Sequence, residues 1–153
     1  MVEEVGELKA LPLAAELGHE EVVLLHDKDS GLRGVIAIHD STFGPGVGGT
    51  RMRPYASYDD AVVDALRLAR AMTYKATMVE MPYGGAKAVI MGDPKLKTEA
   101  MFLALGRAIE QLGGAYVAAE DMNVTVGDLE TVARETRHVI NDDREPVLAV
   151  LSK

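Results

Sequence analysis

Residues 57–94, SYDDAVVDALRLARAMTYKATMVEMPYGGAKAVIMGDP, join a helical pattern to a strand pattern, and this alternation decides the fold class. Ser57 is a good N-cap with Asp60 three residues later, and the apolar positions that follow recur at steps of three and four. The run 88–91 is short, continuously apolar and stopped by Gly-Asp-Pro, which is typical of a strand buried on both faces. The stretch therefore predicts a helix that begins after Ser57, followed by a buried strand.

One face of this predicted helix carries Ala61, Ala65, Leu68 and Met72, and Lys75 is the next residue on that face. Most lysines in proteins lie on the surface, which is the alternative interpretation of Lys75. A lysine that extends an apolar stripe is nevertheless unusual. We therefore expect Lys75 to be buried and to be a candidate functional residue.

The segments before residue 57 indicate a lead-in helix and a β-hairpin. The first 20 residues have a loose helical pattern, which Pro12 is expected to interrupt. Two β-rich runs, 22–26 and 35–39, flank the turn residues 29–31. The hairpin adds antiparallel strands to the sheet.

The segments after residue 94 continue the alternation of helix and strand. A helix is predicted over 97–112, with Met101, Leu105, Ala108 and Leu112 buried and Gly113 after its end. The apolar run 115–119 is a strand, and Glu120 and Asp121 lie at its carboxyl end. A last helix, drawn from the pattern 125–140, has Thr125 as N-cap, Asp128 at its third position, and Leu129, Val132 and Ala133 facing inward. The predicted fold is α/β, with a mixed open sheet and helices on both faces.

Length and composition restrict the class of protein. The 153 residues suit one domain, and a net charge of −8 argues against binding to a nucleic-acid backbone. The chain has no cysteine, which excludes thiolate metal sites and suits a reducing compartment. The N-terminus is acidic rather than signal-like, and no run reaches the length of a membrane span. We expect a soluble cytoplasmic domain with no membrane, nucleic-acid or metal partner.

The segment FGPGVGGTRMRP, residues 43–54, contains the glycine spacing G-x-G-x-x-G of a dinucleotide-binding turn. Such a turn must lead directly into a helix, but the first credible N-cap comes eight residues after Gly49. Pro45 also removes one N–H donor. We therefore predict a loop whose backbone closely approaches something else, and no cofactor-binding residue. A glycine-rich turn without a ligand remains the plain alternative.

Four motifs occur in a characteristic order: GPGVGGTRM at 44–52, AMTYK at 71–75, GGAKAVIMGDP at 84–94 and AAEDM at 118–122. Their order and spacing resemble the N-terminal, substrate-binding and dimerisation domain of the glutamate/leucine/phenylalanine/valine dehydrogenases. The similarity covers roughly residues 20–140 and is closer to the leucine, valine and phenylalanine branch. The two lysines, twelve residues apart, are its most specific signal.

The resemblance implies reversible oxidative deamination of an L-amino acid to a 2-oxo acid and ammonia, with NAD as hydride acceptor. It implies that Lys75 binds the substrate carboxylate, that Lys87 is an amine of lowered pKa that activates water, and that Asp121 moves protons to and from the substrate nitrogen. The remaining implied substrate contacts are Val47, Gly48, Gly49 and Met72.

The chemistry of these residue types agrees with the implied roles. Burial and a nearby cation both lower the pKa of a lysine, as a general base requires, and an acid at the carboxyl end of a strand lies where open α/β sheets place ligands. The plainer interpretations are a surface lysine at either position and a turn or capping role for Asp121. Arg51 is expected to be an ion-paired structural residue, and the four histidines to be structural or solvated.

The chain also departs from the family pattern. Met78, Val79 and Glu80 replace small residues, and Asn123 stands where glycine is common. The match ends near Ile140, so we divide the chain into a domain 1–140 and an atypical tail 141–153, without the hinge or the cofactor domain. We expect a truncated chain that does not bind NAD tightly, is inactive alone, and assembles into a homo-oligomer.

Three functions follow from these observations. The leading one is the substrate-binding half of an amino-acid dehydrogenase, which would need a cofactor-domain partner in trans. The second is a non-enzymatic oligomerisation or regulatory module derived from that family, and the third is a nucleotide-binding protein that uses residues 44–49. The preferred amino acid and the cause of the short length are left open.

Overall fold

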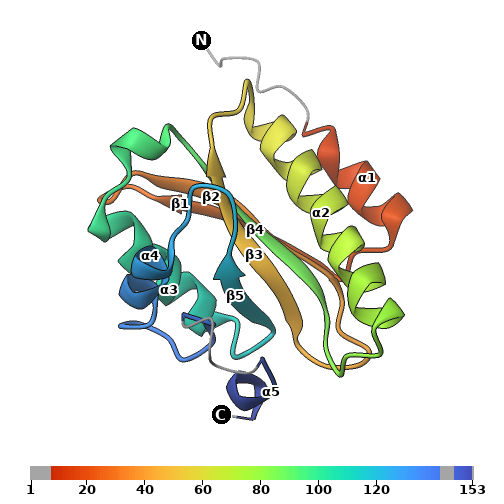
Figure 1. Ribbon diagram of the computed structural model, residues 1–153. Helices are drawn as coiled ribbons and strands as arrows, with labels where there is room; N and C mark the ends of the chain where they lie inside the picture. The colour runs from red at the N-terminus through yellow and green to blue at the C-terminus, as the bar shows by residue number, and fades with distance from the viewer. Residues whose placement is uncertain (1–7, 142–146, 153) are drawn as a thin grey trace.

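The computed structural model describes residues 8–141 and 147–152, and its centre is a mixed sheet of five strands (Figure 1). The strands are β1 (Glu21–Asp27), β2 (Leu32–Asp40), β3 (Gly46–Arg53), β4 (Gly84–Met91) and β5 (Tyr116–Glu120). They lie in the order β1-β2-β4-β3-β5. The pairs β1–β2 and β2–β4 are antiparallel, whereas β3 is parallel to both β4 and β5. The predicted α/β class and mixed sheet are confirmed.

Helices cover both faces of the sheet, as predicted (Figure 1). One face packs against α1 (Ala10–Leu17) and α2 (Tyr58–Met78). The other packs against α3 (Glu99–Gln111) and α4 (Val126–Val132). The elements outside these two layers are the 3-10 turn η1 (Pro94–Leu96) and the short helix α5 (Val147–Leu151). Because the sheet is covered on both sides, all eight residues of β4 are buried.

The helix N-termini form where side-chain caps supply acceptors for unpaired backbone N–H groups. Ser57 caps α2 by accepting from the N–H of Asp60, and Thr125 forms the predicted capping box with Asp128. Thr98 caps α3, so this helix begins two residues later than predicted, after η1. The expectation that Pro12 interrupts the first helix is wrong. This proline is the third residue of α1, where the backbone nitrogen has no partner within the helix to lose.

The segment 46–53 was predicted as a loop but is a strand, β3, between β4 and β5. Its glycines hide the apolar alternation by which a strand is recognised in sequence. They are required by close packing, because a Cβ on Gly48 would lie 1.6 Å from the carbonyl oxygen of Ala86 in β4. The predicted close approach of backbone is therefore real, but the approaching group is a neighbouring strand.

The buried face of α2 differs from the predicted stripe. The buried residues are Ala61, Val62, Ala65, Leu66, Ala69 and Ala76. This face packs mainly on β2 and β4, whereas Leu68 and Met72 are half-buried and Lys75 is exposed. The predicted stripe of residues 61, 65, 68, 72 and 75 thus lies along the margin of the packed face, because α2 is rotated about its axis so that Val62 and Leu66 face the sheet.

The remaining helices differ from prediction in detail. Of the four residues expected to be buried in α3, Leu105 is buried and Met101, Ala108 and Leu112 are half-buried, since this helix is turned toward Phe102 and Ile109. In α4 the inward residues are confirmed, with Leu129 and Val132 buried and Ala133 packed against the core. This helix ends at Val132, well short of the predicted pattern, and Val139 instead forms a β-bridge with Ala118.

Candidate functional site

The candidate site lies on the face of the sheet that carries α2, over the strands β3 and β5 that α2 leaves largely uncovered. In the sheet register Thr50 of β3 pairs with Ala88 on one side and with Glu120 on the other. Side chains of successive residues point to opposite faces of a sheet, so the neighbours Lys87, Gly49 and Asp121 all lie on the other face from this row. Lys87 and Asp121 are thereby brought together across Gly49.

Lys87 and Asp121 form an ion pair, with 2.9 Å between Nζ and Oδ2. The Lys87 side chain is 6% exposed and that of Asp121 is 27% exposed, so the pair is enclosed on the lysine side and open on the carboxylate side. The pair combines residues that were predicted as catalytic from separate motifs. A buried ammonium group beside a carboxylate is an arrangement suited to moving protons on a bound ligand.

Arg51 of β3 gives Asp121 a second cation. Its Nε donates to the Oδ2 of Asp121 over 2.8 Å. Burial by itself raises the pKa of the Asp121 carboxyl, but the hydrogen bonds from Lys87 and Arg51 and their charges outweigh it and lower the pKa below its usual value. Asp121 is therefore held as a carboxylate. The expectation that Arg51 is ion-paired is confirmed.

Gly49 allows the ion pair to form. A Cβ at this position would lie 2.7 Å from the Cβ of Asp121, 2.9 Å from the carbonyl oxygen of Glu120 and 3.0 Å from the Nζ of Lys87. Any side chain would therefore push against both members of the pair. Gly48 faces the other way and is needed for the packing of β3 on β4.

Lys75 does not lie where its sequence pattern suggested. It is exposed near the C-terminal end of α2, and the expectation that it is buried is wrong. Among residues 8–141 and 147–152 it forms no ion pair. Met72, one turn earlier, is half-buried. An exposed, uncompensated lysine is free to bind an anionic group, but the structure records no contact between it and the Lys87–Asp121 pair.

Val47, which is expected to contact the substrate, lies in a small apolar cluster. It is 5% exposed and packs with Val117 of β5 against Val150 of α5, which lies at the foot of the sheet (Figure 1). The expected atypical tail thus contributes a helix over part of the candidate site. The rest of that tail, 142–146 and 153, lies outside the described residues.

Sequence reasoning missed how Asp64 and Tyr55 take part in the site. Asp64 of α2 accepts from Arg51 at 3.5 Å, and the hydroxyl of Tyr55 donates to the same oxygen over 2.5 Å. The signal that could have found them is the inward position of Arg51 on β3, which requires the strand to be recognised first.

Two of the four histidines are structural, as expected. His39 bonds through one ring nitrogen to the hydroxyl of Thr73 and through the other to the carbonyl oxygen of Leu17. The ring of His19 lies edge-on to it, with the centroids 4.7 Å apart. Burial lowers the pKa of His19, against the opposing effect of its bond to the carbonyl oxygen of Leu66. In the described part of the chain no group of three or more acids and histidines is placed to hold a metal ion.

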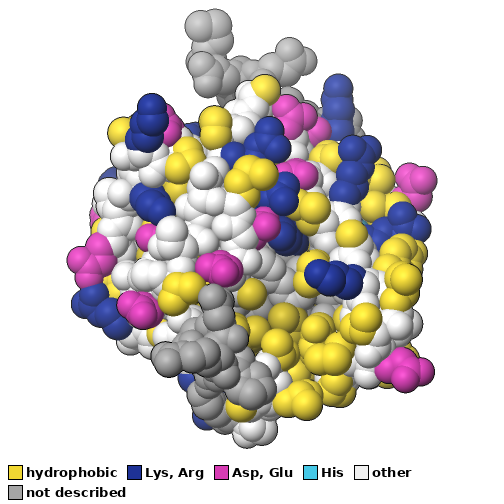
Figure 2. All heavy atoms as spheres, viewed as in Figure 1, with side chains coloured by type: hydrophobic (Ala, Val, Ile, Leu, Met, Phe, Trp, Pro, Cys, Tyr) yellow, Lys and Arg dark blue, Asp and Glu magenta, His cyan; other side chains and the backbone are white. Residues whose placement is uncertain are grey.

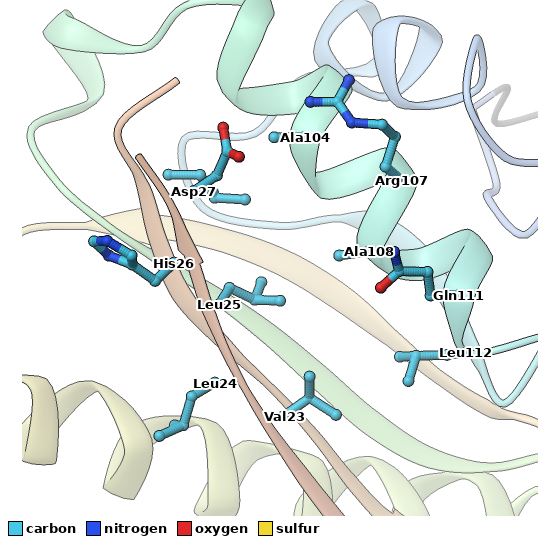
Figure 3. Close-up of a pocket in the computed structure, with 11 residues that line it drawn as sticks. Val23, Leu24, Leu25, His26, Asp27, Ala104, Arg107, Ala108, Gln111 and Leu112 are labelled. Atoms are coloured by element: carbon cyan, nitrogen blue, oxygen red, sulfur yellow. The ribbon is translucent and has the colours of Figure 1, made fainter. Parts of the chain in front are cut away.

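Figure 2 shows the face viewed in Figure 1, with charged side chains of both signs above an apolar surface in the lower part of the view. A separate groove of about 320 Å³ lies between the edge strand β1 and α3, on the face of the sheet opposite the candidate site (Figure 3). Val23 and Leu25 point toward α3 there, whereas Leu24 points away. None of the predicted site residues lines this groove. No helix in the described ranges is both long and apolar enough to cross a membrane.

Comparison with known proteins places this fold and site in a family. The model of the Glu/Leu/Phe/Val dehydrogenase dimerisation domain matches residues 19–139. The chain is 54% identical over 121 residues to a valine dehydrogenase of Streptomyces coelicolor, which covers 78% of this chain and 33% of that protein. It is 54% identical over 122 residues to a leucine dehydrogenase of Bacillus cereus, which covers 79% of this chain and 33% of that protein.

A solved structure agrees with this assignment. The crystal structure of L-tryptophan dehydrogenase from Nostoc punctiforme superposes with a TM-score of 0.82 at 43% identity, over 84% of this chain and 39% of that one. The chain spans about a third of the length of the curated relatives it matches. By the extent of the family-model match and by the shared fold, the chain belongs to the Glu/Leu/Phe/Val dehydrogenase family, of which it carries the dimerisation domain.

Proposed function

We propose that this chain is the substrate-binding part of an NAD-dependent L-amino-acid dehydrogenase that acts on leucine, valine or phenylalanine-like substrates. The reaction is reversible oxidative deamination to a 2-oxo acid and ammonia. The observation that carries the proposal is the ion pair of Lys87 and Asp121, which is buried on the lysine side and open on the carboxylate side. The family to which the chain belongs consists of amino-acid dehydrogenases. The relatives named for valine and leucine support the substrate class.

Each charged residue has a distinct role in this proposal. Lys75, exposed on α2, binds the substrate α-carboxylate, because it has no ion pair of its own among the described residues. Lys87 holds and activates the water that attacks the imino carbon, and Asp121 exchanges a proton with the substrate nitrogen. The substrate lies along the backbone of Gly48 and over Gly49, which faces the same side as Asp121, and Met72 contacts the substrate side chain.

The described residues do not fit the dinucleotide itself. The glycines of the G-x-G-x-x-G segment belong to β3 rather than to a turn before a helix, and the N–H of Gly46 donates to the carbonyl oxygen of Ala115. That N–H group therefore does not point toward a pyrophosphate. NAD is proposed as the hydride acceptor of the whole enzyme, bound by residues other than these.

The test is binding of L-leucine, L-valine and L-phenylalanine to the chain, followed by NMR chemical-shift perturbation. We expect weak binding that perturbs Gly49 and the residues around Asp121 and that is abolished in Lys75→Met. Arg107→Met is the matched control, since Arg107 is an exposed helical cation on the opposite face of the sheet. Absence of binding by the unaltered chain, or equal loss in both variants, contradicts the proposal.

The same preparation tests turnover. We expect no rise in reduced-nicotinamide absorbance with the chain and NAD alone, and a rise when a cofactor-domain partner is added. Turnover by the chain alone contradicts the proposal that it needs such a partner.

A second function, assembly with further copies, is favoured by the exposed apolar side chains around the end of α2. Met78 is 84% exposed, Val79 61% and Phe43 66%, which is unusual for large apolar residues on a free surface. Light scattering of the chain checks this point, with a homo-oligomer expected. A monomer that still binds amino acids would refute the assembly role and leave the binding role standing.

A further inference from the structure

Arg51 connects two carboxylates that come from different elements. Its Nε donates to Asp121 at the end of β5, and its Nη1 lies 3.5 Å from the Oδ2 of Asp64 in α2. The arginine side chain is 16% exposed and both carboxylates are 27% exposed. These residues are 13 and 70 positions from Arg51 in the chain, so the contact ties α2 and β5 to β3.

The bridge continues at both ends. At one end, the hydroxyl of Tyr55 donates to the same oxygen of Asp64 that faces Arg51. At the other end, the Oδ2 of Asp121 is shared between Arg51 and Lys87. The row Asp64–Arg51–Asp121–Lys87 alternates in sign and carries two charges of each kind, so its net charge is zero.

The two oxygens of Asp121 differ in their surroundings. Both of its ion-pair contacts end on Oδ2, and Oδ1 accepts no hydrogen bond among the residues that the structure describes. A carboxylate fixed by one oxygen keeps the other in a defined place for a ligand. A guanidinium group is suited to this task because its N–H groups are held in one rigid plane, whereas a lysine has a single nitrogen on a flexible stem.

We propose that Arg51, anchored by Asp64, is a positioning residue that holds the Asp121 carboxylate by its Oδ2 and leaves Oδ1 for the substrate nitrogen. This inference rests on the proposed function, because it assigns Arg51 a task in the proton exchange at Asp121. It assigns Arg51 no contact with the substrate. Asp64 and Tyr55 act one step further away, by keeping the guanidinium group in place.

Charged and titratable groups reach Asp121 from each element packed around it. They are Lys87 of β4, Arg51 of β3 and, through Arg51, Asp64 of α2. Burial raises the pKa of the Tyr116 hydroxyl in β5, and the nearby Asp121 charge adds to this rise. Arg51 and Lys87 are the cations in this set. Removing Arg51 leaves the Asp121 carboxylate with Lys87 alone.

The test follows the side-chain carboxyl carbon of Asp121 by NMR in a pH titration of the whole chain. In Arg51→Met we expect the midpoint to rise by about one pH unit, because a paired cation lowers a carboxyl pKa by about 1–3 units. In Arg51→Lys, which preserves the charge, we expect a smaller rise together with averaging of the Asp121 side-chain couplings over several rotamers. A role through charge alone would leave both quantities in Arg51→Lys unchanged.

Two more variants complete the experiment. Asp64→Asn retains the size of the anchor and is expected to average the Asp121 rotamers as Arg51→Lys does, which provides a test should Arg51→Met not fold. Arg107→Met is the control, since it breaks a 3.6 Å pair with Glu135 on the opposite face of the sheet and is expected to leave Asp121 unchanged.

The same samples are titrated with L-leucine, and Arg51→Lys is expected to bind about tenfold more weakly than the unaltered chain. If the titration midpoint and the rotamer of Asp121 are unchanged in all Arg51 and Asp64 variants, the positioning role is wrong. Amino-acid binding by the unaltered chain would still stand in that case. An unaltered chain that does not bind L-leucine, L-valine or L-phenylalanine overturns the proposed function, and this inference with it, whatever the midpoint does.

Discussion

Loss of Asp121 is expected to destabilise the folded chain more than loss of Lys87, although the two residues form one ion pair. Asp121→Asn removes the carboxylate from a lysine side chain that is only 6% exposed, whereas Lys87→Met leaves Asp121 27% exposed and still paired with Arg51. At 2.9 Å the Coulomb attraction is about 6 kcal/mol for an effective dielectric constant of about 20, before the desolvation cost is subtracted. Leaving a buried charge without its partner costs about 3–5 kcal/mol.

We therefore expect Asp121→Asn to lower the free energy of unfolding by about 3 kcal/mol, at the low end of that range because an amide oxygen still accepts a hydrogen bond. We expect Lys87→Met to lower it by about 1 kcal/mol, because no buried charge is left unpaired. Urea denaturation of the whole chain, followed by circular dichroism, measures both. The exposed pair of Arg107 and Glu135 is the control, and Arg107→Met and Glu135→Gln should each cost less than about 1 kcal/mol.

The same pair has a pH signature. The Asp121 carboxyl has a pKa below its usual value of 3.8 in the folded chain, so near that value the unfolded chain binds more protons than the folded one. The carboxylate therefore contributes stability that is present above the unfolded pKa and is lost as the pH falls through the folded pKa. The difference between the unaltered chain and Asp121→Asn should narrow below about pH 4. A larger cost for Lys87→Met, or a difference that persists in acid, would refute the reasoning.

Four further substitutions test the fold. Gly48→Ala should abolish folding, seen as loss of the cooperative urea transition, because its Cβ would lie 1.6 Å from the carbonyl oxygen of Ala86; a folded variant would show that β3 is not packed as described. Glu80→Gly should raise the free energy of unfolding by up to about 1 kcal/mol, because Glu80 has a left-handed φ of +54°. The neighbouring Val79→Gly, at φ −101°, should instead lower it, and equal effects would count against backbone strain at position 80. Ser57→Ala should cost about 1 kcal/mol by removing the cap of α2, and an unchanged thermal midpoint would contradict that role.

Much of the secondary structure was predictable because its determinants are local. The caps at Ser57 and Thr125 depend on residues three positions apart. The hairpin follows from two β-rich runs around a short turn, and the strand β5 from its apolar run. The motifs around Lys87 and Asp121 likewise marked two residues that lie together in the folded chain.

The strand β3 and the environment of Lys75 were not predictable in the same way. Gly48 and Gly49 have no side chains whose alternation would mark a strand, and β3 exists because β4 and β5 pair with it on both sides. Whether Lys75 is buried or exposed depends on the rotation of α2 about its axis, which leaves it exposed. That rotation is set by how Val62 and Leu66 pack on the sheet, and the steps of three and four fit more than one face of the helix.

By itself, the sequence determined the fold class, the family and the caps that begin α2 and α4, and it marked Lys87 and Asp121 as candidate site residues. Only the tertiary structure decided that Arg51 joins Asp121 to Asp64 and that Val47 lies beneath α5. The physical reason is distance along the chain. Periodicity and capping act over a few residues, whereas an ion pair between residues 70 positions apart exists only after the sheet has brought their strands side by side.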